Sequence, residues 1–141
     1  MPFLLDTATI SEYRRVRPNT GLIAWTQAHA FEETYLGTPT LGEFIQGVHT
    51  LAPSQQRDHL QRWVAEIERR FEGHIVPFDA EVARVWGEVN GRARRRGRKL
   101  PVIDSQLAAI AVVHDLTVVT RNLRDFDIPE FESLKVVSPW T

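Results

Sequence analysis

The chain has 141 residues, no cysteine and a formal net charge of -1 at pH 7. This length suits a single domain over residues 1–141 with a core of its own, and the missing cysteines exclude disulfides, a thiolate nucleophile and a cysteine-ligated zinc site. No apolar run approaches the roughly 20 residues of a membrane-spanning helix, and the N-terminus lacks a signal-peptide pattern. We therefore expect a cytoplasmic protein.

The elements alternate along the chain between short apolar strands and amphipathic helices. Phe3–Leu5 is an apolar run typical of a buried strand, and Thr7 or Thr9 can cap the helix that follows Asp6. The pattern further predicts helices over 19–30, from 39 or 40 through 48, 54–71, from 80 into the arginines after 91, and 104–114, and strands over 34–38, 75–78, 116–120 and 136–137. This alternation favours an α/β fold with a parallel sheet covered on both faces.

The charge is unevenly distributed along the chain. Six of the 17 basic residues lie between positions 92 and 99, where no acidic residue occurs, and the rest of the chain carries 11 basic and 18 acidic residues, a formal charge of -7. We call this run the basic strip; it consists of Arg92, Arg94, Arg95, Arg96, Arg98 and Lys99.

Four acidic residues fall where a parallel sheet places its ligands, at strand ends or in the first turns of helices. They are Asp6, Glu43, Asp104 and Asp125. One such residue is usually a helix cap, but four without a lysine nearby in the sequence indicate a site. Clustered carboxylates repel one another unless a cation neutralises them, and oxygen-only ligands favour Mg²⁺ or Mn²⁺. The five histidines are scattered, and the chain has no phosphate-binding glycine loop and no nucleophile elbow.

Four segments carrying these acids resemble the motifs of PIN-domain ribonucleases, in particular the VapC/FitB-like toxins of type II toxin–antitoxin systems. They are residues 3–12, 40–47, 104–111 and 117–126, and the resemblance extends over the whole chain. It implies a three-layer α/β/α sandwich around a mainly parallel sheet of four to five short strands.

The resemblance also implies an activity and a set of site residues. By analogy, Mg²⁺ or Mn²⁺ is held by Asp6, Glu43, Asp104 and Asp125, and a metal-activated water attacks a phosphodiester of RNA. Thr120 and Asn122 match positions that support the site or position water, and Asp127 is an alternative to Asp125. The family commonly has asparagine where this chain has Ala8, which removes an amide but no ligand.

The resemblance implies partners as well. Family members usually form homodimers and are silenced by a small VapB-like antitoxin that inserts a basic side chain into the acidic site; DNA is contacted only indirectly, through the antitoxin complex. The basic strip has two interpretations, a solvated helix end favoured by the helix dipole or a contact with RNA phosphates. Its position shortly before Asp104 favours the second.

Two other functions compete with the ribonuclease. A catalytically silent PIN-like domain would bind nucleic acid or a partner, and loss of one of the four acids would favour it. A receiver-like phosphate-transfer domain would need a second acid beside Asp6 and a lysine after a late strand. The chain has Thr7, Ala8 and Arg121 at those places.

Overall fold

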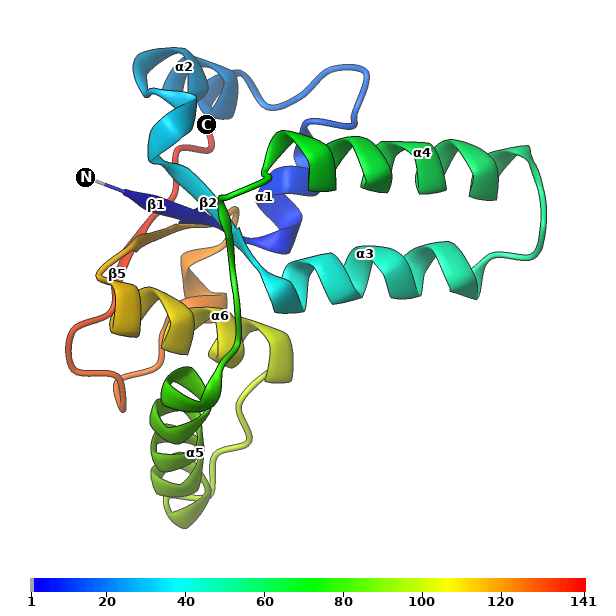
Figure 1. The fold of residues 1–141 in the computed structure, drawn as a ribbon. Helices are drawn as coiled ribbons and strands as arrows, with labels where there is room; N and C mark the ends of the chain where they lie inside the picture. The colour runs from blue at the N-terminus through cyan, green and yellow to red at the C-terminus, as the bar shows by residue number, and fades with distance from the viewer. Residues whose placement is uncertain (1) are drawn as a thin grey trace.

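Five short parallel strands form the sheet at the centre of the computed structural model, which describes residues 2–141 (Figure 1). In chain order the strands are β1 Phe3–Leu5, β2 Thr34–Gly37, β3 Ile75–Val76, β4 Thr117–Val119 and β5 Lys135–Val137. Their spatial order is β3-β2-β1-β4-β5, and every neighbouring pair is parallel. Along the chain, β2 and then β3 are therefore added on one side of β1, and β4 and then β5 on its other side.

Helices connect the strands and cover both faces of the sheet. They are α1 Thr7–Glu12, α2 Thr20–Ala28, α3 Thr38–Thr50, α4 Gln55–Arg70, α5 Ala80–Arg95 and α6 Val102–His114, with short 3₁₀ helices η1 Phe31–Glu33 and η2 Leu123–Phe126. Figure 1 shows α3 and α4 as an antiparallel pair that projects beyond the sheet, and α5 beside α6 on the opposite side. The prediction of a three-layer α/β/α sandwich with a central parallel sheet is confirmed.

The core has two parts, one on each face of the sheet, and β1 contributes to both. Leu4 packs with α5 and α6, whereas Phe3 and Leu5 pack with α1, α3 and α4. All three side chains are buried because successive strand residues point to opposite faces and helices cover each face. A wholly apolar β1 thus anchors its C-terminal residue, Asp6, between the two layers.

Two predicted helix starts were wrong. Asp6 itself caps α1, accepting the Thr9 N–H at 2.8 Å, because its charged oxygen lies at the end of β1 where the first free N–H groups point. The helix ends at Glu12. Asp104 does not open α6: the extended backbone of Pro101 precedes the helix, which starts at Val102 and places Asp104 third. The segment that follows β4 contains η2.

Within residues 2–141, none of the helices has both the length and the apolar character needed to cross a bilayer.

Gly37, at the end of β2, allows α6 to lie close to the sheet. A Cβ there would stand 2.9 Å from Leu107 Cδ2 and 3.0 Å from Ile110 Cδ1. We predict that Gly37→Ala lowers the free energy of unfolding by about 1–3 kcal/mol through overpacking. As a control, Gly87→Ala at an exposed position of α5, where a Cβ meets no atom within 4 Å, should raise it by about 0.5–1 kcal/mol. Urea denaturation measures both; wild-type stability in Gly37→Ala would contradict the close approach.

Candidate carboxylate site

Asp6 lies at the C-terminal edge of the sheet, where the strand order reverses between β1 and β4. Its backbone N–H donates to the Val119 carbonyl at 3.1 Å, and its side chain accepts the Thr9 N–H. The Thr9 hydroxyl donates to the same Val119 carbonyl at 2.9 Å. Asp6 is almost fully buried and its backbone is bonded on both sides, so its carboxylate has a fixed position. Such a switch point is where open parallel sheets bind ligands.

Glu43 reaches the same edge from α3. It is half-buried and lies in the second turn of the helix that follows β2. The start of α3 is tied to the start of α1 by the Thr7 and Thr40 hydroxyls, whose oxygens are 3.0 Å apart. This bond holds the two helices that carry Asp6 and Glu43 against each other at their N-termini.

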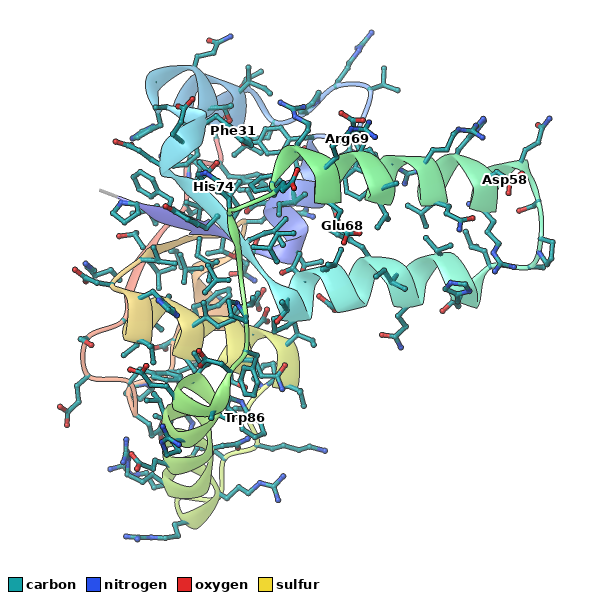
Figure 2. All side chains as sticks on the ribbon, viewed as in Figure 1. Phe31, Asp58, Glu68, Arg69, His74 and Trp86 are labelled. Carbon is teal, nitrogen blue, oxygen red and sulfur yellow. The ribbon has the colours of Figure 1, made fainter. Side chains whose placement is uncertain are left out.

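Asp104 lies in the first turn of α6, where the helix dipole favours a negative charge. Its neighbour Ser105 is fully buried and accepts a hydrogen bond from the indole N–H of Trp86 at 2.9 Å. The Ser105 hydroxyl in turn donates to the Val102 carbonyl at 3.0 Å. Figure 2 shows Trp86 on α5. The Trp86–Ser105 bond therefore fixes the first turn of α6, and with it Asp104, against α5.

Asp125 is presented by the loop that follows β4. Thr120 is fully buried, and its hydroxyl accepts the Asn122 N–H at 3.2 Å. The Asn122 side chain caps η2 by accepting the Arg124 N–H at 3.1 Å. Asp125 is the third residue of η2, and the next residue, Phe126, is buried in the core. Thr120 and Asn122 thus shape the turn that carries Asp125.

The four carboxylates influence one another electrostatically. Burial, followed in order by the charges of Asp125, Asp6 and Glu43, raises the pKa of Asp104 to about 6. We call these four residues the carboxylate cluster. Among residues 2–141 none of them is ion-paired with a lysine, arginine or histidine. The structure therefore brings together the four acids that the sequence singled out, with their repulsion uncompensated.

Asp6 has opposing influences on its pKa. Burial raises it and the charge of Asp125 adds to this, whereas hydrogen bonds from Thr120 and Thr9 stabilise the ionised form and lower it; the pKa remains above its ordinary value. Asp125 is the residue of its loop whose charge acts on both Asp6 and Asp104. Asp127, offered by the sequence as an alternative, instead has its carbonyl bound by Arg98 at 3.3 Å.

The chemistry of the cluster fits a hard divalent cation, because its donors are all carboxylate oxygens and they lack a counter-charge. As their side chains stand, no three acidic or histidine residues in the described part of the chain converge closely enough to hold an ion. Side-chain rotation toward a cation would have to complete the ligand set. Ala8, which replaces the family's usual asparagine, is exposed in the first turn of α1.

Three of the six residues of the basic strip share one partner. Three arginines contact Glu130 in the loop between β4 and β5: Arg92 donates to its carbonyl, and Arg96 and Arg98 pair with its carboxylate. Arg94 and Lys99, with Gly97 and Arg98, line an open hollow of about 430 Å³. Sequence reasoning missed Glu130, whose only sequence signal is an acidic residue beside the buried Phe131.

A separate cavity of about 340 Å³ lies between α1, α2 and α4. Aromatic and aliphatic side chains dominate its lining, and Phe31, labelled in Figure 2, stands at this cavity. The Phe31 ring stacks at a tilt against His74 and Phe71, with centroids 6.1 and 5.1 Å away. None of the four acids lines this cavity, so it is not part of the carboxylate cluster.

Known proteins resemble this chain along nearly its whole length. A family model described as PIN domain matches residues 3–131. The chain is 34% identical over 138 residues to "Toxin FitB" of Neisseria gonorrhoeae, covering 97% of each protein, and 30% identical over 138 residues to "VapC ribonuclease Y4jK" of Sinorhizobium fredii, covering 97% of this chain and 96% of that protein.

A solved structure shares both fold and sequence. The "Structure of FitAB bound to IR36 DNA fragment" superposes with a TM-score of 0.84 at 32% identity, covering 99% of this chain and 96% of the other. These matches agree with the resemblance of the four sequence motifs.

Removing one charge from the cluster should stabilise the metal-free fold. The folded pKa of Asp104 is about 6 against 3.8 unfolded, so this group costs stability as pH rises from about 4 through 6. We predict that Asp104→Asn raises the unfolding free energy at pH 7 by about 1 kcal/mol after solvent screening, or about 3 °C in Tm. Thermal unfolding in EDTA between pH 4 and 7 measures this.

The matched control is Glu72→Gln, which removes one exposed carboxylate outside the cluster and should leave the pH profile of stability unchanged. A lower Tm for Asp104→Asn than for wild type at pH 7 would show that the carboxylates do not repel one another.

Proposed function

The chain belongs to the PIN-domain family, and from this membership we propose that it is a divalent-metal-dependent ribonuclease acting as the toxin of a toxin–antitoxin pair. The observation that carries the proposal is the carboxylate cluster, in which three acids raise the pKa of the fourth, Asp104, and no described cation is paired with any of them. The relatives named as a toxin and as a ribonuclease support the same class of activity.

The ligand set we propose for Mg²⁺ or Mn²⁺ is the four residues of the cluster. An ion bound there would supply activation of a water and neutralisation of charge on the phosphodiester in transit. Asp6 would keep its orientation through Thr9 and Thr120, so its carboxylate is preorganised before the ion arrives. Asp104, whose pKa is about 6 without an ion, would be held ionised by the bound cation and so would serve as a ligand.

Thr120 and Asn122 have positioning roles in this proposal. Thr120 stabilises the ionised form of Asp6, and its hydroxyl accepts the Asn122 N–H and donates to the Asn122 carbonyl, while Asn122 caps η2. They therefore connect the ends of β1 and β4 to the turn that bears Asp125. Asp127 is not assigned a ligand role, because its backbone is held by Arg98 and its charge does not contribute to the raised pKa values.

We also propose the partners that this activity requires. An acidic site without a counter-charge is suited to accept a basic side chain, which is how a small VapB-like antitoxin would silence it. The solved relative is a FitAB complex bound to a DNA fragment. For this chain, DNA contact would be made indirectly, through the antitoxin. A homodimer and a cytoplasmic location complete the proposal.

RNA cleavage tests the proposed function directly. Purified wild type, freed of any partner, should cleave total cellular RNA in Mg²⁺ and not in EDTA. Asp104→Asn should reduce the rate by about 100-fold or more, because it removes one charge that neutralises the ion, while Glu72→Gln should not. Electrophoresis of the RNA products over time measures the rates.

The alternative, a catalytically silent PIN-like domain, makes the opposite prediction. It would bind RNA or an antitoxin equally well with either residue at position 104 and would produce no fragments. Equal cleavage by wild type and Asp104→Asn would exclude the cluster as the site of reaction.

Fewer than six residues of the basic strip are available to bind RNA. Arg92, Arg96 and Arg98 contact Glu130, which leaves three exposed cations without that contact: Arg94 and Arg95 at the helix end, and Lys99 after it. We predict that Arg94→Gln with Arg95→Gln weakens binding of single-stranded RNA. The slope of log K for binding against log salt concentration is negative and should become about 1.4 less steep, as expected for two lost phosphate contacts.

Fluorescence anisotropy at several salt concentrations measures this slope. The matched control replaces two other exposed arginines, Arg62→Gln with Arg84→Gln, for the same change of net charge. An equal loss of slope in both double variants would mean that net charge, and not the basic strip, governs binding.

A further inference from the structure

Glu130 is a buried carboxylate with an unusually complete set of cationic partners. Its side chain has no solvent exposure, yet burial is outweighed by Arg98 and Arg96, whose hydrogen bonds and charges hold the pKa of Glu130 below its ordinary value. Arg98 makes the closer contact, and Arg96 lies 3.4 Å from the other carboxylate oxygen. The Arg92 guanidinium adds a hydrogen bond to the Glu130 carbonyl at 3.3 Å. Glu130 is therefore ionised and fixed.

Arg98 binds two residues of the same loop. One terminal nitrogen pairs with the Glu130 carboxylate, while the other donates to the Asp127 carbonyl at 3.3 Å. The planar guanidinium makes these contacts from two separate nitrogens in a fixed geometry, which the single nitrogen of an ammonium group does not reproduce. Asp127 is two residues after Asp125, so this fork holds the segment that presents Asp125.

Arg98 is also close in sequence to Asp104, a second member of the carboxylate cluster. Arg98 lies in the short connection between α5 and α6, and Asp104 follows six residues later in the first turn of α6. Leu100, in the same connection, and Phe126, in η2, are both buried in one hydrophobic cluster. The hydrogen bonds of Arg98 and this shared apolar cluster therefore join the two segments that carry Asp104 and Asp125.

These two segments bear charges that repel. Asp125 is the largest electrostatic cause of the raised pKa of Asp104. Without a cation, that repulsion pushes η2 away from the start of α6. An ion pair between the same two segments opposes the displacement, and its buried carboxylate makes separation costly because Glu130 would lose its partners.

We propose that Arg98 and Glu130 are positioning residues that hold Asp125 at its working distance from Asp104. The inference rests on the proposed function. The pair contacts neither substrate nor metal; it sets the geometry of the groups that would.

The competing interpretation is that the pair only stabilises the fold. A stabilising pair would change the midpoint of unfolding but not the properties of the molecules that remain folded. A positioning pair would change the affinity for a divalent ion and the turnover of folded protein at 25 °C. Metal affinity, kcat and KM therefore distinguish the two, provided that unfolding is measured on the same samples.

The experiment uses the full chain with Arg98→Gln, Arg98→Lys, Glu130→Gln and the double variant Arg98→Gln with Glu130→Gln. Mn²⁺ affinity is measured by calorimetry, kcat and KM on an RNA oligonucleotide that wild type cleaves, and stability by urea denaturation. Arg84→Gln, an exposed arginine of α5 outside the strip, controls for the change of net charge.

We expect Arg98→Gln to weaken Mn²⁺ binding and lower kcat by about tenfold or more, with a smaller effect on KM. Arg98→Lys should recover part of the loss, because it keeps the ion pair but not the Asp127 contact. The double variant should be no worse than either single variant in Mn²⁺ affinity, as for residues that act as one unit. Arg84→Gln should match wild type.

Each other outcome contradicts either the positioning role of the pair or the proposed function. Wild-type Mn²⁺ affinity and kcat in Arg98→Gln, whatever its midpoint of unfolding, would show that the pair is only structural, and the proposed function would stand. If Arg98→Gln does not fold, unchanged values in Arg98→Lys alone overturn the positioning role. A wild type that neither binds Mn²⁺ nor cleaves RNA would overturn the proposed function and this inference together.

Discussion

Mutual repulsion among the four acids of the carboxylate cluster is the constraint that the rest of the structure has to satisfy. Like charges in a partly buried site destabilise each other, and their pKa values rise accordingly. The pKa of Asp104 near 6 reflects burial together with three neighbouring carboxylates. Such a cluster persists only if the surrounding elements are held more firmly than the repulsion can move them.

Contacts between elements that are distant in the sequence hold the four acids in place. β1 is buried on both faces, so Asp6 at its end cannot shift without disturbing both halves of the core. Hydroxyl contacts then fix the neighbouring helix starts, between Thr7 and Thr40 on one side and between Trp86 and Ser105 on the other. Each acid is thus placed by a contact that joins two elements, and the cluster depends on tertiary packing more than on any one helix.

The elements and the four acids were predictable because their signals are local. Apolar runs such as Phe3–Leu5 are short enough to be strands, and acids that follow them must lie at one edge of a parallel sheet. Helix starts were less predictable: Thr7, Thr9 and Asp104 all have cap-forming side chains, and which one caps depends on where the strand ends. The position of Pro101 could have indicated that α6 begins before Asp104.

Glu130 could not be predicted, because its partners lie more than 30 residues away and none of its neighbours in sequence shares its role. The basic strip, by contrast, contained a usable clue. Arg92 and Arg96 are four residues apart on one helix and so share a face, while Arg94 and Arg95 point elsewhere. That spacing separates arginines that bind an internal carboxylate from arginines that remain exposed.

The division of the strip changes what the chain's net charge means. Part of the positive charge that appeared free for a polyanion is committed to a buried carboxylate of the same chain, so fewer cations are without an acidic partner than the sequence suggests. The same run of residues therefore has two separable effects. Exposed arginines attract RNA through a long-range, salt-sensitive field, whereas the paired ones act at short range on the loop that bears Asp125. Substitutions within the basic strip should therefore have two kinds of effect. Only substitutions of the arginines that bind Glu130 should alter the geometry of the carboxylate cluster.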